Sequence, residues 1–189
     1  MIVEEGMSPQ EGPEDELTLP QIVARETAVR VVLFNAQDEI LLQGVNVPGK
    51  PEFFITPGGR LEGDGEILLE AAKREIEEET GFKEFDITTK APVFTGSHVM
   101  HKSKGLVEMT EHFFVARLSS DEDQIDESKL QLTEEEQALF TGQKWFKLEE
   151  LESPDLIFVP INLREFAQAC LRGQHIPEVD FSDPPQFSP

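Results

Sequence analysis

Short apolar runs separated by polar turns dominate this chain, and their spacing predicts a succession of β-strands. Residues 27–34 and 39–43 are rich in β-branched side chains, and the intervening Asn35-Ala36-Gln37-Asp38 is typical of a hairpin connection. A short strand is also expected from Phe53 into a tight turn at Gly58-Gly59. Further strands are predicted at residues 85–89, 92–100, 110–118 and 143–147.

A helix is expected from about Glu66 to the glycine at position 81. Leu69, Ala72 and Ile76 recur on one face at helical spacing, which is typical of a helix that packs on a core. Gly81 stands where a left-handed residue would end the helix. The predicted helix therefore has one buried side and one charged side.

Two further helices are predicted in the second half of the chain. Thr133 and Glu136 have capping-box spacing, so a short helix through Phe140 is expected. Residues 161–171 lie between a proline and a glycine, which favour the start and the end of a helix. Together with the strands, these helices indicate an α/β fold.

The composition predicts one domain flanked by two less ordered ends. The chain has 189 residues, enough to bury a full core. Residues 1–20 combine acidic residues with prolines and are expected to be disordered. Residues 175–189 should be loosely ordered, although Phe181 and Phe187 could dock on the domain or on a partner. The domain itself is expected at residues 21–174.

Charge and hydropathy limit the classes of partner. The net charge is −22 with only 16 Lys and Arg residues, which argues against binding of long nucleic acids. A small anionic substrate remains compatible with this charge if metal ions supply positive charge locally. No apolar run approaches the length of a membrane span, and residues 1–20 lack the basic and apolar regions of a signal peptide. A cytoplasmic protein without a membrane partner is expected.

The predicted mid-chain helix carries a cluster of carboxylates. Glu75, Glu78 and Glu79 follow i, i+3, i+4 spacing and fall within an arc of roughly 100°. Such charges repel one another, and a divalent cation would remove that cost. Ligands that are all oxygen point to Mg²⁺ or Mn²⁺, and a carbonyl of the Gly58-Gly59 turn could complete the site. The alternative is an ordinary solvated acidic face, and Glu77 with the i, i+4 pairs Glu70–Arg74 and Lys73–Glu77 belongs to such a face.

The segment from Gly59 to Phe82 resembles the Nudix box of the Nudix hydrolases. From Glu66 onward it carries every fixed residue of that pattern, with Phe82 as a large apolar residue at its end: Glu66, Arg74, Glu75, Ile76, Glu78, Glu79 and Gly81. The front of the box differs, because six residues rather than five separate Gly59 from Glu66. The resemblance implies a Nudix-type α/β/α sandwich with a mixed β-sheet.

The resemblance also implies a reaction, the Mg²⁺-dependent hydrolysis of a nucleoside diphosphate derivative by metal-activated water. By similarity Glu75, Glu78 and Glu79 would be metal ligands, and one of them would also serve as the base. Arg74 would orient a carboxylate. Glu66 could take part in the site or be an acid that the dipole of a first helical turn favours. Family members are often dimers, so a homodimer is one expected state.

Site assignments beyond the helix are more open. Nudix enzymes often bring an additional acid to the metal from outside the box, and Glu111 fits that role as well as it fits a surface glutamate, with Glu108 as its competitor. Arg60 in the loop is an expected substrate contact. Phe54 is expected to stack on a base, in competition with Phe94 and Trp145, although most of the 14 phenylalanines must be core.

Other reactive side chains point away from further chemistry. Cys170 is the one cysteine of the chain and is interpreted as a packed structural thiol. His98, His101 and His112 lack the spacing of a compact zinc site. They could contact substrate phosphates or be ordinary strand and loop residues. The tyrosine that diadenosine polyphosphate hydrolases of the family often carry is absent, because the chain contains none.

A second class of function stays open beside the enzyme. A non-catalytic Nudix-fold module could sense a nucleotide or bind a protein through its acidic ends. The extra loop residue and the long ends favour this alternative. The complete set of helix carboxylates favours the Mg²⁺-dependent pyrophosphohydrolase.

Overall fold

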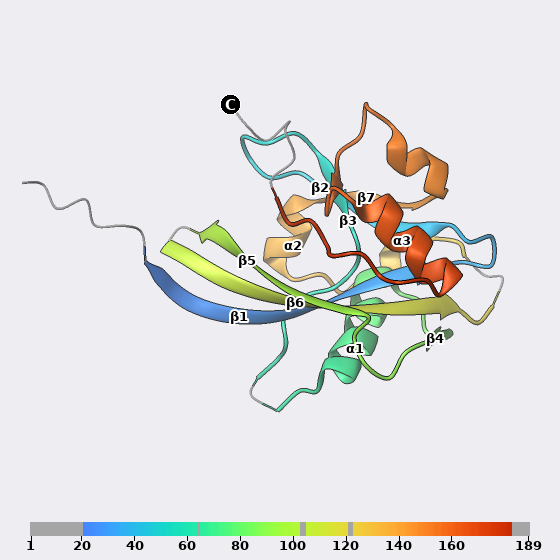
Figure 1. The fold of residues 1–189 in the computed structure, drawn as a ribbon, viewed down its shortest axis with the longest axis horizontal. Helices are drawn as coiled ribbons and strands as arrows, with labels where there is room; N and C mark the ends of the chain where they lie inside the picture. Colours follow the sequence, from blue (N-terminus) through green and yellow to red (C-terminus); the bar gives the residue numbers. More distant parts are fainter. Residues whose placement is uncertain (1–20, 64, 103–104, 121–122, 183–189) are drawn as a thin grey trace, which may run out of the picture.

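A computed structural model describes residues 21–63, 65–102, 105–120 and 123–182 of the chain (Figure 1). The acidic segment 1–20 and Phe187, about which the sequence made predictions, lie outside these residues. No described helix is both long enough and apolar enough to cross a membrane. The domain limits of 21 and 174 stay a prediction.

A mixed sheet of eight strands forms the centre of the described fold. Six strands follow the order β4-β6-β1-β2-β3-β8, while β5 pairs with β6 and β7 pairs with β2. The strands are β1 (Ile22–Phe34), β2 (Ile40–Val45), β3 (Phe53–Ile55), β4 (Phe85–Ile87), β5 (Phe94–Lys102), β6 (Gly105–Leu118), β7 (Phe140–Phe146) and β8 (Phe158–Val159). The pair β1 and β6 is parallel and the pair β1 and β2 is antiparallel, so the predicted mixed sheet is confirmed.

Strands β1 and β6 are both longer than their apolar runs indicated. β1 starts at Ile22 instead of residue 27, and β6 starts at Gly105 instead of residue 110. Their additional residues pair with each other in a parallel register that begins at Ile22 and Leu106. This pairing between segments far apart in sequence extends both strands beyond what their own composition predicts.

Helices cover both faces of the sheet, which gives the expected α/β/α layers (Figure 1). Helix α1 spans Leu68–Thr80, α2 spans Glu134–Leu139 and α3 spans Leu163–Arg172, with 3-10 turns at Glu127–Lys129 and Leu148–Glu152. Helix α1 packs on one face through residues such as Ile76, and α3 packs on the other through residues such as Phe166. Alternate residues of β1 enter the two cores, as the twofold period of a strand requires.

Helix α1 starts later than predicted, at Leu68 rather than about Glu66. Glu66 lies outside the helix, and its carboxylate accepts a hydrogen bond from the backbone N–H of Glu62 at 2.6 Å. Gly81 ends the helix with φ 73°, as its position predicted. Glu66 is therefore not an acid of the first helical turn, and the helix-dipole explanation of that residue is wrong.

The turn after β3 is fixed to the neighbouring strand β1. The backbone N–H of Val29 donates to the Gly59 carbonyl at 2.9 Å, and that of Val31 donates to the Pro57 carbonyl at 2.8 Å. Gly58 has φ 141°, and a Cβ atom there would lie 2.1 Å from the Val29 carbonyl oxygen. Only glycine allows this close approach, and the approach holds the turn against the sheet beside α1.

Candidate active site

Two of the three predicted helix carboxylates are buried at the glycine turn. Glu75 and Glu79 are only 5% and 6% exposed to solvent, whereas Glu78 is partly exposed. The Glu79 carboxylate accepts the Gly58 backbone N–H at 2.6 Å and the Gln43 side-chain amide at 3.1 Å. Helix α1 therefore presents its acidic residues to the turn, and not only to solvent.

Glu75 lies against the second glycine of the turn. A Cβ atom at Gly59 would stand 2.6 Å and 2.8 Å from the two Glu75 carboxylate oxygens. The position therefore has space for a carboxylate only because the residue is glycine. The Gly59 carbonyl, which was expected to help bind a metal, accepts the hydrogen bond from Val29 described above.

Arg74 connects the carboxylates of α1 to the preceding loop. Its Nη1 donates to Glu75 at 2.8 Å and to Glu78 at 2.9 Å. Its Nε donates to Glu66 at 2.8 Å, and its Nη2 donates to the Arg60 carbonyl at 3.1 Å. Arg74 was expected to pair with Glu70 on the solvated side, and the structure places its guanidinium among the site carboxylates instead. Arg74 and Glu66 therefore pair across the loop that contains the extra residue.

A second arginine, Arg30, holds the acid outside the box. Its Nε donates to Glu111 at 2.9 Å and its Nη1 donates to the Gly58 carbonyl at 2.9 Å. Glu111 is buried, whereas its competitor Glu108 is paired with the exposed Arg25 at 2.7 Å. The sequence interpretation missed Arg30. An arginine within the apolar run of β1 was the available signal, because a charge in such a strand needs a partner.

Burial and charge set the protonation of these acids in opposite directions. Burial raises the pKa of Glu79 to about 8, against the lowering effect of the Gly58 N–H. Burial also raises the pKa of Glu75, against the neighbouring Arg74. Burial is the largest effect on Glu111 and opposes its ionisation, but Arg30 and His98 together outweigh it and lower the pKa of Glu111 to about 2. Glu111 is therefore ionised at neutral pH, while Glu79 without a cation favours the neutral form.

The donor set suits a hard divalent cation, although Glu75 and Glu78 are paired with Arg74 in this structure. Among the described residues no three Asp, Glu, His or Cys side chains lie together in an arrangement that could hold a metal ion. Glu75 disfavours the charge of Glu79, Glu78 disfavours the charge of Glu75, and Glu136 disfavours the charge of both Glu75 and Glu79. A cation with oxygen ligands would relieve that repulsion. Glu75, Glu78 and Glu79 are the residues that could bind it.

Two adjoining cavities border the carboxylates. A groove of about 610 Å³ contains Glu75, Glu78 and Arg74. A smaller chamber of about 240 Å³ contains Arg30 and Glu111. Arg60, Glu79 and Glu136 line both cavities, so the groove and the chamber lie side by side. The chamber's apolar wall includes Met100, Met109, Leu132, Leu139 and Phe140.

Several aromatic candidates lie away from this space. The Phe54 ring packs against Phe146 at 5.0 Å and Phe158 at 5.9 Å between centroids, which places it in the core. Trp145 donates its indole N–H to the Asp123 carbonyl at 2.7 Å. The chamber wall instead uses methionine, leucine and phenylalanine side chains that the sequence interpretation did not single out. A larger cavity, of about 1090 Å³, lies at the C-terminal end of α1 and contains none of the predicted site residues.

Cys170 packs against the core beneath α3. Burial raises the pKa of its thiol to about 12, so the thiol is protonated at neutral pH. A thiolate is the nucleophilic form of cysteine. The placement thus agrees with a structural residue.

Comparison with known proteins places this geometry in a family. A family model described as NUDIX domain matches residues 24–169. A search of curated proteins gives no match. Solved structures with the same fold include a NUDIX hydrolase from Nitrosomonas europaea, with 21% identity and a TM-score of 0.54, covering 87% of this chain and 99% of that one.

Two other similar structures have nucleotide-type ligands or substrates in their names. A C. elegans Ap4A hydrolase in a binary complex has 19% identity and a TM-score of 0.52, covering 78% of this chain and 98% of that one. The NUDIX domain of Shewanella oneidensis NrtR, complexed with ADP ribose, has 22% identity and a TM-score of 0.52, covering 78% and 88%. At these identities the likeness establishes the fold.

Proposed function

The chain belongs to the Nudix family of pyrophosphohydrolases, and we propose that it hydrolyses the pyrophosphate linkage of a nucleoside diphosphate derivative with Mg²⁺. Nucleoside triphosphates and nucleotide sugars are the expected compounds. One observation carries the proposal: the groove that borders the helix carboxylates adjoins an apolar chamber and shares Arg60, Glu79 and Glu136 with it. That combination suits a ligand with a metal-bound phosphate part and a flat apolar part.

Glu75, Glu78 and Glu79 would hold the metal ion, with Mn²⁺ as a substitute for Mg²⁺. A bound ion supplies neutralisation of phosphate charge and a water of lowered pKa. Arg74 orients Glu75 and Glu78 by donating to both from one guanidinium nitrogen. We assign the role of general base to Glu75 or Glu78, which line the groove beside Arg74.

Basic side chains at the chamber would contact the substrate phosphates. Arg60 and Lys102 both line the chamber, and both are paired with Glu26, at 3.5 Å and 2.7 Å. These pairs are partly exposed and therefore weak enough to exchange Glu26 for a phosphate. Arg60 keeps the substrate-binding role that its position in the loop indicated.

The base of the nucleotide would lie against the apolar wall rather than against Phe54. Met100 and Phe140 offer polarisable and aromatic surface in the chamber. Phe54 is occupied by its core contacts. The proposed base contact is therefore at the ends of β5 and α2.

The alternative, a non-catalytic nucleotide-sensing or protein-binding module, has the NrtR domain as a similar fold. Its sequence support was the extra loop residue and the long ends. The loop preserves the pairing of Glu66 with Arg74 in spite of that residue, so this support is weakened. We retain the enzyme as the proposal.

A product screen tests the proposed reaction. The protein would be incubated with Mg²⁺ and nucleoside triphosphates, nucleotide sugars, ADP-ribose or dinucleoside polyphosphates, and products identified by mass. The same screen would use Glu78→Gln, Glu79→Gln and the control Glu77→Gln, because Glu77 is exposed on the same helix. We expect kcat to fall by at least about 100-fold in the first two variants and to stay unchanged in the control. Turnover that survives both substitutions would contradict the residue assignments, and no turnover of any compound would favour the binding module.

A further inference from the structure

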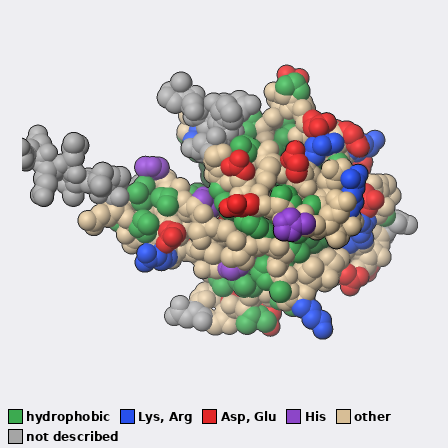
Figure 2. All heavy atoms as spheres, viewed as in Figure 1, with side chains coloured by type: hydrophobic (Ala, Val, Ile, Leu, Met, Phe, Trp, Pro, Cys, Tyr) green, Lys and Arg blue, Asp and Glu red, His purple; other side chains and the backbone are tan. Residues whose placement is uncertain are grey.

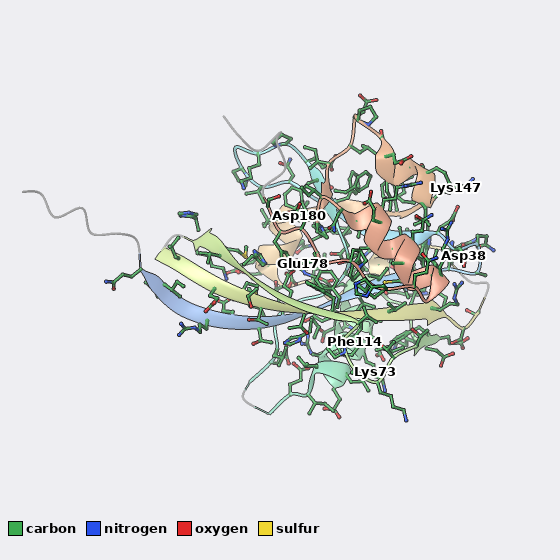
Figure 3. All side chains as sticks on the ribbon, in the orientation of Figure 1. Asp38, Lys73, Phe114, Lys147, Glu178 and Asp180 are labelled. Carbon is green, nitrogen blue, oxygen red and sulfur yellow. The ribbon has the colours of Figure 1, made fainter. Side chains whose placement is uncertain are left out.

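The segment that follows α3, residues 174–182, returns across the sheet side of that helix (Figures 1 and 3). Val179 is only 4% exposed and belongs to the core beneath α3. The Asn162 side chain holds the segment from both sides: its amide N–H donates to the Glu178 carbonyl at 2.7 Å, and its Oδ1 accepts the Asp180 backbone N–H at 2.9 Å. We call residues 174–182 the strap. Glu178 and Asp180 lie along its path, as their labels in Figure 3 show, and Figure 2 shows acidic side chains on this face of the molecule.

The strap places an aromatic ring directly on a histidine of β5. Phe181 and His98 are stacked, with centroids 4.5 Å apart and planes inclined by 9°. The ring fits because residue 96 is glycine: a Cβ atom there would lie 2.7 Å from Phe181 Cε2. The ring centroids of Phe94 and Phe113 each lie 6.3 Å from that of Phe181, so aromatic contacts fix the position of the Phe181 ring.

The stacked histidine faces the acid that Arg30 holds. His98 Nε2 lies 3.9 Å from Glu111 Oε2, while Arg30 Nε donates to the other carboxylate oxygen, Oε1, at 2.9 Å. The Glu111 carboxylate thus has a hydrogen bond from Arg30 on one oxygen, while its other oxygen faces the buried His98 Nε2, which has no hydrogen-bond partner among the described residues and lies beyond hydrogen-bond distance. Arg30 also donates to the Gly58 carbonyl, and the Gly58 N–H donates to Glu79.

We propose that Phe181 and His98 are positioning residues of the active site, and that the strap fixes Glu111 through them. Phe181 covers the face of the imidazole and so fixes the plane in which its edge points to Glu111. Without that cover the imidazole would be free to turn, and Glu111 would keep only its contact with Arg30. The inference rests on the proposed function, since it gives Glu111 a part in that reaction.

Substitution of the strap aromatic tests the coupling. Phe181→Ala is expected to lower kcat about 10-fold with little change in KM, the size typical of losing a residue that orients a ligand of the site. Phe181→Tyr keeps the ring and should retain activity. Phe85→Ala is the matched control, because Phe85 is also a partly buried phenylalanine but packs in the core on the α1 side. It should lower stability without lowering kcat. A loss of kcat of the same size in the Phe85 control, or none in Phe181→Ala, would overturn the proposal.

A double substitution shows whether Phe181 acts through Glu111. If it does, Phe181→Ala should change kcat by less than about twofold in a Glu111→Gln background, because both changes remove the same interaction. An equal loss of kcat in both backgrounds would exclude the route through Glu111.

A spectroscopic measurement keeps the inference separate from the proposed reaction. In the metal-free protein, NMR signals of the His98 ring should shift when Phe181 becomes alanine and also when Glu111 becomes glutamine, while the Phe85 control leaves them in place. Unchanged His98 signals in Glu111→Gln would refute the coupling even if the enzyme is active. If no compound is hydrolysed, the proposed function fails, and the NMR shifts alone then decide whether the strap fixes Glu111.

Discussion

The backbone N–H of Gly58 donates to the Glu79 carboxylate at 2.6 Å, and this hydrogen bond joins the glycine turn to the acidic helix. The Gly58 carbonyl on the other side of the residue accepts from Arg30, which also binds Glu111. A single turn residue therefore connects an acid of the Nudix box with an acid from β6. The relative position of the two acids depends on the backbone at Gly58.

Removing the space beside Glu75 should impair the site without unfolding the chain. In Gly59→Ala the new Cβ atom would meet the Glu75 carboxylate at less than 3 Å, so the carboxylate must move. We expect kcat to fall by at least about 10-fold while the thermal midpoint changes little. Gly65→Ala is the matched control, because a Cβ atom at Gly65 meets nothing within 4 Å. Equal kcat values for the two variants would show that the position of Glu75 is unimportant.

The geometry of Arg74, and not only its charge, should be required. Arg74→Lys keeps a cation but loses the planar group that contacts Glu66, Glu75 and Glu78 together. We expect a loss of about 10-fold to 100-fold in kcat, measured with saturating Mg²⁺. Arg172→Lys, an exposed exchange in the last turn of α3, is the control and should be neutral. Full activity of Arg74→Lys would mean that a positive charge suffices.

Met100 and Phe54, the two candidate contacts for the nucleotide base, should respond differently to substitution by alanine. Met100→Ala removes part of the chamber wall and should raise KM about 10-fold at nearly constant kcat. Its neighbour Val99 is also exposed but does not line the chamber, so Val99→Ala is the control. Phe54→Ala should instead lower the free energy of unfolding, by up to about 3 kcal/mol, and leave KM unchanged. If KM rises in Phe54→Ala and not in Met100→Ala, the nucleotide base is bound by Phe54 instead of the chamber wall.

The raised pKa of Glu79 predicts how the stability of the metal-free protein depends on pH. With a pKa of about 8 when folded and an ordinary value near 4.5 when unfolded, the folded state binds more protons between those values. The free energy of unfolding should therefore decrease as pH rises from about 5 to about 8. Glu79→Gln removes this contribution, so the free energy of unfolding should depend less steeply on pH. Urea unfolding in EDTA at several pH values measures this dependence.

Burial also raises the pKa of Glu75. The dependence of the unfolding free energy on pH should therefore be weaker in Glu79→Gln but still present. Glu77→Gln serves as the control in the same titration and should keep the wild-type slope. Identical slopes for wild type and Glu79→Gln would show that Glu79 is charged in the folded protein across this range.

Much of the fold follows from local signals in the sequence. The hairpin at residues 35–38 joins β1 to β2 as predicted, and Gly81 ends α1. The capping box at Thr133 and Glu136 is formed at the start of α2. Each of these features depends on residues within one turn or one strand. Strand lengths were less predictable, because the first residues of β1 and β6 are ordered by pairing with each other.

The residues proposed to carry the chemistry were recognisable from the sequence alone. The spacing of Glu75, Glu78 and Glu79 and the match to the Nudix box are properties of one continuous segment, so local geometry is enough to recognise them. The glycine turn before the helix was visible in the same way. The family assignment followed from this segment and is confirmed by the match over residues 24–169.

Which charges meet, and which surfaces enclose the site, depends on contacts between segments that are far apart in the sequence. Arg30 and Glu111 are separated by 81 residues and meet because β1 and β6 are parallel neighbours. The assignment of Phe54 to the core, and of Met100 and Phe140 to the chamber, depends on how the sheet and α2 pack. The contact of Phe181 with His98 arises because the strap crosses back over β5. These are relations between distant segments, and the burial that selects them exists only after the chain has folded.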